Sequence, residues 1–318
     1  MVEIISLIDI GTYSTRLLIA GIHKKDNVEE TIKSIDEILS IGRITALGRN
    51  VKKNRYLERE AIEETLAVLR EYTAILKEYK ASKILGFATE ACRIAENGME
   101  FLEKVRKLGI DVQLIDGDKE AYLSFLATAY SLDIDGRFTV IDQGGGSTEF
   151  AYGIKEKGNI KLLKSTSLPF GIVNLTEEFL KKDPPTELEI ENLKNYLKGE
   201  ITKILDYMKD TEYIIGLGGT ITTLVALEKN IYPYNSKKVH GEKLSRDTIQ
   251  KWLKKLISIP TIERQKYPQI EDKRAKVLPA GILIFDTTLE LFKKDEVVIS
   301  DRGLRYGALI EYILKNYK

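Results

Sequence analysis

Two stretches of the sequence decide its fold: LIDIGTYSTRL at residues 7–17 and VIDQGGGSTEF at residues 140–150. They align without a gap, and a constant 133 residues separate Asp9 from Asp142 and Ser14 from Ser147. Each stretch has an apolar run, a turn with Asp-x-Gly and Ser-Thr, and a second apolar run, which is typical of a β-hairpin. Such turns are common by themselves, but here the flanking apolar residues match too. A repeat at this spacing indicates two similar domains rather than a solenoid.

The segments that follow the first hairpin alternate between helix and strand. Leu57–Tyr79 carries apolar residues at helical spacing among charged ones, which predicts an amphipathic helix. Lys83–Ala88 and Asp111–Ile115 are predicted strands, and we expect a helix between them at Met99–Lys107. This strand–helix–strand order predicts an α/β architecture.

The second half repeats this order after its own hairpin. We expect strands at Arg137–Ile141 and Phe150–Ile154, and a short strand at Glu212–Ile215 that runs into a glycine-rich turn. Thr186 is a predicted helix N-cap, because Glu189 stands at the capping-box position. The remaining predicted elements are a strand at Lys161–Leu168, helices at Ile221–Asn230, Arg246–Ser258 and Asp272–Phe292, a strand at Glu296–Ser300 and a terminal helix at Leu304–Asn316.

Length and composition limit the classes of protein to which the chain can belong. At about 150 residues per domain, 318 residues suggest two domains. The 49 Lys and Arg residues nearly balance 48 Asp and Glu residues, so a uniformly basic surface is excluded and no nucleic-acid partner is expected. Cys92 is the single cysteine, which excludes an intrachain disulfide and fits a reducing compartment. No apolar run reaches the roughly 18 residues of a membrane span, so we expect a cytoplasmic protein without membrane association.

Three glycine-containing turns lie at predicted strand ends. We name them the first turn (Gly11–Ser14), the second turn (Gly144–Ser147) and the third turn (Gly216–Thr220). Glycine lets backbone N–H groups approach an anion closely, and the N–H groups of a turn can form an anion-binding nest. The third turn also leads into a predicted helix, whose N-terminus favours negative charge. A tight hairpin needs glycine even without a ligand, so each turn alone leaves both interpretations open, whereas the three together favour phosphate.

Carboxylates flank the second turn. Asp142 precedes it and Glu149 follows it, and both would repel a phosphate unless a hard cation lay between them. Mg²⁺ suits this arrangement, because it needs few protein oxygens and keeps water and phosphate oxygens as ligands. Asp142 could instead only stabilise its turn, but the pattern favours the metal interpretation. The counterpart of Glu149 in the first copy is Arg16, whose guanidinium can contact a phosphate with two hydrogen bonds.

Further motifs identify a family. The three turns, with ATEACR at residues 88–93 and GDKEA at residues 117–121, closely resemble the exopolyphosphatase / guanosine pentaphosphate phosphohydrolase family. DKRA at residues 272–275 and SDRGLR at residues 300–305 extend the resemblance over essentially the whole chain. Because several spaced motifs agree in their order, the resemblance is specific. The family belongs to the larger group of actin-like, sugar-kinase and heat-shock ATPase folds.

The resemblance implies a fold and an activity. The implied fold is α/β, with two duplicated actin-like (ribonuclease H-like) domains and a cleft between them. We place the first domain at residues 1–123 plus 302–318 and the second at residues 124–301. The implied activity is Mg²⁺-dependent release of terminal phosphate from inorganic polyphosphate, or of the 5′-γ-phosphate of pppGpp to give ppGpp, as in the stringent response. Polyphosphate or guanosine penta- or tetraphosphate is therefore the expected partner.

The resemblance also implies roles for individual residues. Glu120, at the start of a predicted helix, matches the catalytic carboxylate that activates water. Asp142 and Glu149 match acids that handle the metal and the water, so Glu149 is both a catalytic and a metal candidate. The implied phosphate-binding residues are Gly11, Thr12, Ser14, Arg16, Arg93, Gly144, Gly145, Gly146, Ser147, Gly218, Gly219 and Thr220.

Two positions depart from the family pattern. Gln143 stands where an apolar residue is usual, and Lys119 replaces the acid that precedes Glu120. Longer members carry a C-terminal helical domain for which this chain is too short, so processive action on long polyphosphate is not expected. Two alternatives within the same superfamily stay open: an ATP-dependent small-molecule kinase and a non-catalytic nucleotide-binding protein.

Three other residues of reactive types are expected to be structural. His240 has no Cys or His at ligand spacing, which argues against a metal site. Cys92 has no evident histidine partner and is expected to be buried. Trp252 lies at helical spacing with Leu253 and Leu256, which predicts a core position.

Overall fold

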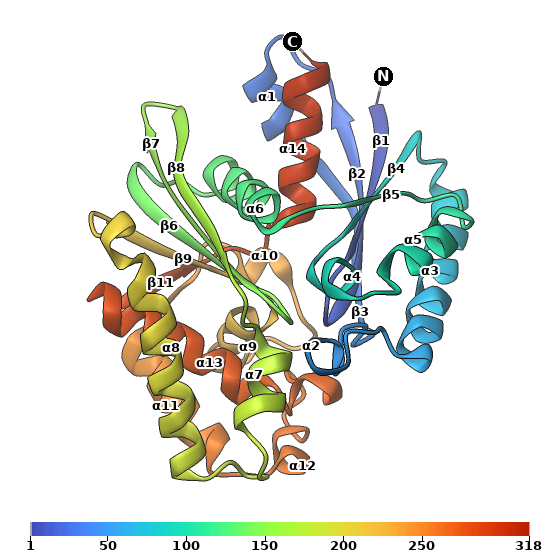
Figure 1. Cartoon of the computed structure of the whole chain (residues 1–318). Coiled ribbons are helices and arrows are strands. Elements are labelled where there is room, and N and C mark those ends of the chain that lie inside the picture. Colours follow the sequence, from blue (N-terminus) through green and yellow to red (C-terminus); the bar gives the residue numbers. More distant parts are fainter. Residues whose placement is uncertain (1, 318) are drawn as a thin grey trace. The chain divides into compact units, whose positions relative to one another are not determined.

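The computed structural model describes residues 2–317 and contains two compact units (Figure 1). Unit 1 runs to Tyr130 and resumes at Leu304, and unit 2 comprises Ser131–Gly303. The boundary expected between residues 123 and 124 falls inside α6 (Gly117–Ser131), which is one uninterrupted helix. The division therefore comes at the end of that helix, and the second boundary follows Gly303 rather than residue 301.

Unit 1 is built on a five-stranded sheet with the order β3-β2-β1-β4-β5. The predicted hairpin is confirmed as β1 (Val2–Ile10) and β2 (Ser14–His23), which pair antiparallel. The edge strand β3 (Asp36–Ile44) was not predicted, because its side chains are mostly exposed and show little apolar periodicity. β4 (Lys83–Ala88) and β5 (Asp111–Leu114) confirm the two predicted strands and run parallel to β1.

Helices cover both faces of this sheet. Successive residues of a strand point to opposite faces, and β1 has apolar side chains on each. Ile8 and Ile10 pack with α3 (Arg59–Tyr79) and α5 (Gly98–Arg106), whereas Ile5 and Leu7 pack with α6 and α14 (Leu304–Asn316). The short helices of unit 1 are α1 (Val28–Lys33), α2 (Val51–Asn54) and α4 (Glu90–Ile94).

Unit 2 repeats this topology. The order of its six-stranded sheet is β10-β11-β9-β6-β7-β8. Read across the sheet from β8, the first two strand pairs (β8–β7 and β7–β6) are antiparallel and the next two (β6–β9 and β9–β11) are parallel. The sheet of unit 1 has the same sequence of pairings from β3 to β5. In unit 2, β10 adds an antiparallel strand beyond β11. The strands are β6 (Gly136–Gln143), β7 (Thr148–Glu156), β8 (Asn159–Leu168), β9 (Tyr213–Leu217), β10 (Lys243–Ser245) and β11 (Glu296–Ile299). The duplication predicted from the sequence is therefore present in the strand order.

The helices of unit 2 largely follow the predictions. Thr186 caps α8 (Glu187–Met208) and forms the expected capping box with Glu189. The single helix predicted over 272–292 is wrong: a 3₁₀ turn, η1 (Asp272–Arg274), precedes α13 (Leu278–Phe292), whose first turn contains Pro279. Proline is tolerated in a first turn but does not continue an earlier one. The other helices are α7 (Ile172–Phe179), α9 (Gly219–Glu228), α10 (Ser236–Val239), α11 (Arg246–Ile257) and α12 (Thr261–Arg264).

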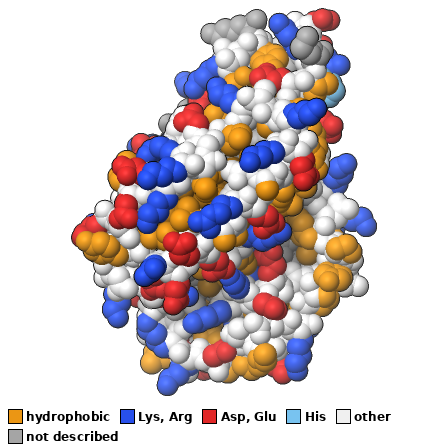
Figure 2. Space-filling view, turned by 90° about the vertical axis from the view of Figure 1, so that its right-hand side faces the viewer, with side chains coloured by type: hydrophobic (Ala, Val, Ile, Leu, Met, Phe, Trp, Pro, Cys, Tyr) orange, Lys and Arg blue, Asp and Glu red, His pale blue; other side chains and the backbone are white. Residues whose placement is uncertain are grey.

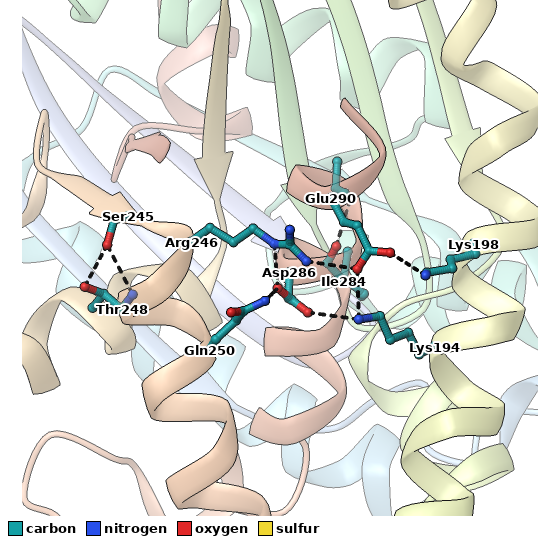
Figure 3. A network of polar contacts seen from close by, with 10 residues as sticks. Lys194, Lys198, Ser245, Arg246, Thr248, Gln250, Ile284, Asp286 and Glu290 are labelled. Carbon is teal, nitrogen blue, oxygen red and sulfur yellow. Dashed lines mark hydrogen bonds and ion pairs between the residues drawn. The ribbon is translucent and has the colours of Figure 1, made fainter. Parts of the chain in front are cut away.

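A polar network joins three helices of unit 2 (Figure 3). The buried Asp286 of α13 accepts hydrogen bonds of 2.9 Å from Arg246 Nε and from Gln250 Nε2 of α11. Glu290, one turn further along α13, pairs with Lys194 of α8 at 2.9 Å and with Lys198. A buried carboxylate such as that of Asp286 requires such partners, so the network fixes how α8, α11 and α13 pack.

The surface agrees with the near balance of charges. On the face shown in Figure 2, Lys and Arg side chains are interspersed with Asp and Glu side chains. Among the described helices, none combines the length and the apolarity that crossing a membrane requires.

Candidate functional site

The two hairpins place equivalent residues at equivalent positions. In unit 2, Asp142 lies directly opposite Glu149 across the β6–β7 ladder, and in unit 1 Asp9 lies opposite Arg16 across β1–β2. Directly opposed residues of an antiparallel pair project from the same face, with their Cβ atoms about 5 Å apart. The turns close alike as well: the N–H of Gly144 donates to the carbonyl of Ser147, and that of Gly11 to Ser14, both at 3.0 Å.

The carbonyl groups of the second turn are bonded to α7. Those of Gly144 and Gly145 accept from the N–H groups of Ile172 and Val173 at 3.1 and 2.8 Å, and that of Gly146 accepts from Asn174 Nδ2 at 2.6 Å. In a planar trans peptide, the C=O group and the following N–H group point in opposite directions. The N–H groups of Gly145, Gly146 and Ser147 are therefore turned away from α7, which is the arrangement of an anion-binding nest.

The carbonyl groups of the first turn are also hydrogen-bonded, in this case to the segment at residues 45–48. The carbonyl of Thr12 accepts from the N–H of Gly48 at 2.8 Å, and that of Tyr13 accepts from Thr45 and Ala46 at 3.1 and 2.9 Å. By the same peptide geometry, the N–H groups of Tyr13 and Ser14 point away from this segment. Arg16 Nε donates to Ser14 Oγ at 3.2 Å, which holds the guanidinium beside the turn.

The third turn leads directly into the N-terminus of α9. Gly218 has φ +105°, a conformation that favours glycine, and it caps α9. The guanidinium of Arg274 packs onto Gly219 so closely that a Cβ there would lie 1.8 Å from Nη1. Arg274 also pairs with Glu271 at 2.8 Å. Sequence reasoning did not name Arg274 as a site residue, although the DKRA motif contained it.

Thr220 takes part in this turn through its backbone only. Its side chain is fully buried, and a Cβ on Gly281 would lie 2.2 Å from its Oγ1. The hydroxyl is therefore directed into the interior against α13, and the N–H of Thr220 is the group placed at the start of α9. Gly218 and Gly219 lie at the turn itself, as the sequence predicts.

Glu120 lies in the first turn of α6 and is nearly buried. Asp116 caps this helix, since its Oδ1 accepts from the N–H of Lys119 at 2.8 Å. Arg93 Nη1 lies 3.3 Å from Glu120 Oε1 and donates to the carbonyl of Ile115 at 2.7 Å. The Lys119 ammonium instead contacts Glu311 of α14 at 2.5 Å. The cation beside Glu120 is therefore Arg93, and not the Lys119 that precedes it in the sequence.

The acid of the ATEACR motif, Glu90, is also near Arg93. Glu90 is buried at the start of α4, and burial raises the pKa of its carboxyl, while Arg93 and Lys52 oppose this shift. The sequence signal for Glu90 was its place in the motif, but its burial could not be read from the sequence.

The carboxylates of the second turn differ in exposure. Glu149 is buried and accepts a 2.8 Å hydrogen bond from Ser167 Oγ of β8, whereas Asp142 is partly exposed. Among residues 2–317, no three acidic, histidine or cysteine side chains converge as a ready-made metal cage. A cation here would take its protein oxygens from this pair and its other ligands from water and substrate, a pattern that fits Mg²⁺.

Cys92, His240 and Trp252, which the sequence predicts to be structural, all have structural contacts. Cys92 is buried, and burial raises the pKa of its thiol to about 12, which disfavours a thiolate nucleophile. His240 has both ring nitrogens in hydrogen bonds, with the carbonyl of Ser131 at 3.1 Å and the N–H of Asp301 at 3.2 Å. Trp252 is buried and donates to Glu228 at 2.7 Å.

Proteins related in sequence match nearly all of this chain. Exopolyphosphatase 2 of Mycobacterium tuberculosis is 28% identical over 316 residues, which cover 95% of this chain and 96% of that protein. A guanosine-5′-triphosphate,3′-diphosphate pyrophosphatase of Vibrio atlanticus is 26% identical and matches 96% of this chain and 58% of its own length. A bifunctional 3-dehydroquinate synthase/phosphatase of Fusobacterium nucleatum is 36% identical over 96% of this chain, which spans 46% of that longer protein.

The solved structures agree with these relatives. The crystal structure of the Aquifex aeolicus member of the Ppx/GppA protein family is 46% identical to this chain, covers 100% of both chains and has a TM-score of 0.83. The sequence pattern of the Ppx/GppA phosphatase family matches residues 22–316. The chain is therefore a hydrolase with the two-domain actin-like fold, and it belongs to the Ppx/GppA phosphatase family.

Proposed function

We propose that this phosphatase hydrolyses the terminal phosphoanhydride bond of inorganic polyphosphate or of pppGpp, with Mg²⁺ as its cofactor and Glu120 as the base that activates water. The observation that carries the proposal is the opposition of Asp142 and Glu149 beside the second turn. Two carboxylates next to N–H groups that suit a phosphate require a cation between acid and ligand. Relatives named exopolyphosphatase and pppGpp pyrophosphatase support these two substrates.

The turns would bind the phosphates. Phosphoryl transfer depends mainly on positioning and on stabilising the charge of the transferred group. In unit 1, the outward N–H groups of the first turn and the Arg16 guanidinium would be the donors. In unit 2, the donors would be the N–H groups of the second turn and of the start of α9, together with the Arg274 guanidinium. Such donors are effective because their directions are fixed before the substrate binds.

Asp142 and Glu149 would hold the cation. When bound, Mg²⁺ would neutralise charge that develops on the phosphate oxygens. Asp142, the more exposed acid, is suited to contact the cation directly. Glu149 is oriented by Ser167, so it can hold a cation-bound water or the cation itself in a defined position.

Glu120 would accept the proton of the attacking water. Glu120 lies in the first turn of α6, and the Arg93 guanidinium, 3.3 Å from its Oε1, can hold the carboxylate in place for this role. Arg93 is also exposed enough to meet a phosphate, since 30% of its side chain is accessible. General-base help of this kind contributes about 10²–10⁴-fold to the rate.

The test is phosphate release from polyphosphate, pppGpp and ATP by the wild-type protein and by Glu120→Gln, with and without Mg²⁺. We expect release from polyphosphate or pppGpp, and a decrease in kcat of about 10²–10⁴-fold in Glu120→Gln with substrate binding retained. Asp118→Asn, an exposed change in the same helical turn, is the matched control. Turnover of Glu120→Gln within a few-fold of wild type would exclude Glu120 as the base. Consumption of ATP only in the presence of a small-molecule acceptor would indicate a kinase.

A further inference from the structure

Gln143 joins the second turn to a distant helix. It is the last residue of β6, stands between Asp142 and Gly144, and is 5% exposed. Its Nε2 donates to the carbonyl of Gly281 in α13 at 2.7 Å, across 138 residues of sequence. The carbonyl acceptor fixes which end of the amide carries the nitrogen. The side chain thus connects the end of β6 to the first turns of α13.

The backbone of Gln143 also supports the third turn. A Cβ on Gly218 would lie 2.6 Å from the carbonyl oxygen of Gln143 and 3.3 Å from its Cβ. The chain of the third turn therefore passes directly against Gln143, which only glycine permits at this distance. Through this one residue, the second turn, the third turn and α13 of unit 2 are in contact.

This connection has an energetic cost. Among the described residues, the buried atoms without a hydrogen-bond partner include Gln143 Oε1 and Thr220 Oγ1. Both lie next to the α-carbon of Gly281, since a Cβ there would be 3.0 Å from Oε1 and 2.2 Å from Oγ1. A buried acceptor without a donor destabilises the folded state. An apolar side chain of similar size would avoid that cost, so stability alone does not account for a glutamine here.

We propose that Gln143 is a positioning residue. It sets the distance between the second and third turns and the position of the neighbouring Asp142. This inference rests on the proposed function, because the spacing matters only if both turns bind one substrate and Asp142 holds the cation. The hydrogen bond to Gly281 acts through the backbone of β6, because it fixes Gln143, which is bonded to Asp142 on one side and to Gly144 on the other. Misplacement of a reacting group by about 1 Å can cost up to about 10²-fold in rate.

The test compares Gln143→Met with the wild-type protein. Methionine has a similar volume and removes both the hydrogen bond and the unpartnered oxygen, so we expect the melting temperature to change little. We expect kcat to fall by about 10-fold, the Mg²⁺ concentration for half-maximal activity to rise several-fold, and KM to change less than kcat. We also expect amide hydrogen exchange to become several-fold faster without ligand at Gly144, Ile172 and Val173, whose N–H groups bond to the second turn, and at Thr222, whose N–H group bonds to the third turn.

Thr139→Val is the matched control. Thr139 is buried on the same strand and makes a 2.6 Å hydrogen bond with Thr211, away from both turns. We expect this variant to lower the melting temperature and to leave kcat and the exchange of the turns unchanged. Wild-type kinetics and exchange in Gln143→Met, or equal losses in both variants, would overturn the inference. If the wild-type protein releases phosphate from no substrate, the proposed function fails, and the exchange comparison still decides whether Gln143 holds the turns.

Discussion

Asp142 and Glu149 face each other across the β6–β7 ladder, as Asp9 and Arg16 do across β1–β2. The duplicated hairpin has thus kept an aspartate at one position and diverged at the other. In unit 2 the pair is two carboxylates, which under the proposed function would hold the cation. In unit 1 the pair is a carboxylate and a guanidinium, and the guanidinium contacts the serine of its own turn.

We predict that Asp142→Asn and Glu149→Gln each lose most Mg²⁺-dependent turnover while folding normally. Each change keeps the size of the side chain and removes the charge that would hold the cation. The measurement is phosphate release as a function of Mg²⁺ concentration, with circular dichroism as the check of folding. Glu156→Gln, at the exposed far end of the same strand, should behave as wild type. Near wild-type activity at limiting Mg²⁺ in either variant would remove that residue from the metal site.

Arg16→Ala should raise KM for polyanionic substrates by about 10-fold to 10²-fold, because a lost charge-assisted hydrogen bond costs about 1.5–3 kcal/mol. The variant is compared by steady-state kinetics with Arg43→Ala. Arg43 lies on the neighbouring strand β3, is about half exposed and is paired with Glu71 at 2.9 Å. An unchanged KM in Arg16→Ala would show that Arg16 has no contact with the substrate.

The network around Glu290 predicts a contribution to acid stability. Hydrogen bonds from Lys198 and Lys194 lower the pKa of Glu290 to about 2, below its unfolded value of about 4.5. A lowered carboxyl pKa stabilises the folded state above the unfolded pKa, and this contribution is lost as the pH falls from about 5 towards 2. The free energy of unfolding, measured with urea between pH 7 and pH 2.5, should therefore depend less on pH in Glu290→Gln than in the wild-type protein. Glu191→Gln, an exposed change on α8, is expected to keep the wild-type slope, and an equal slope in both variants would contradict the prediction.

His240 predicts a second pH dependence at higher pH. Burial lowers the pKa of His240, and the Ser131 carbonyl and Asp301 oppose this shift while Arg302 adds to it. Because the folded state then binds the proton less readily than the unfolded state, the protein loses stability as the pH falls below about 6.5. Protonation would also place a donor on Nδ1, which now accepts from the N–H of Asp301. The free energy of unfolding should fall less between pH 7 and pH 5 in His240→Gln than in His23→Gln, which changes the other histidine.

Short-range patterns in the chain were sufficient to predict much of the fold. The two hairpins, the strand at Lys83–Ala88, the terminal helix and the capping box at Thr186 all agree with the structure. Each depends on residues close together in the sequence, where periodicity and turn chemistry act directly. The constant spacing of the repeat also predicted that Asp142 and Glu149 are equivalent to Asp9 and Arg16. The edge strand β3 and the break before α13 were missed, because their local patterns are weak or resemble those of a longer helix.

The partners of the site residues were decided by tertiary packing. Arg93 rather than Lys119 pairs with Glu120 because α4 and α6 meet at the end of β4, whereas Lys119 faces α14 on the other side of the helix. Arg274 reaches Gly219, Asn174 holds the second turn, and Gln143 bonds to Gly281. These contacts join segments about 28 to 138 residues apart. Side-chain contacts over such separations depend on how whole elements pack, and no periodicity along the chain specifies which polar group a buried donor will meet.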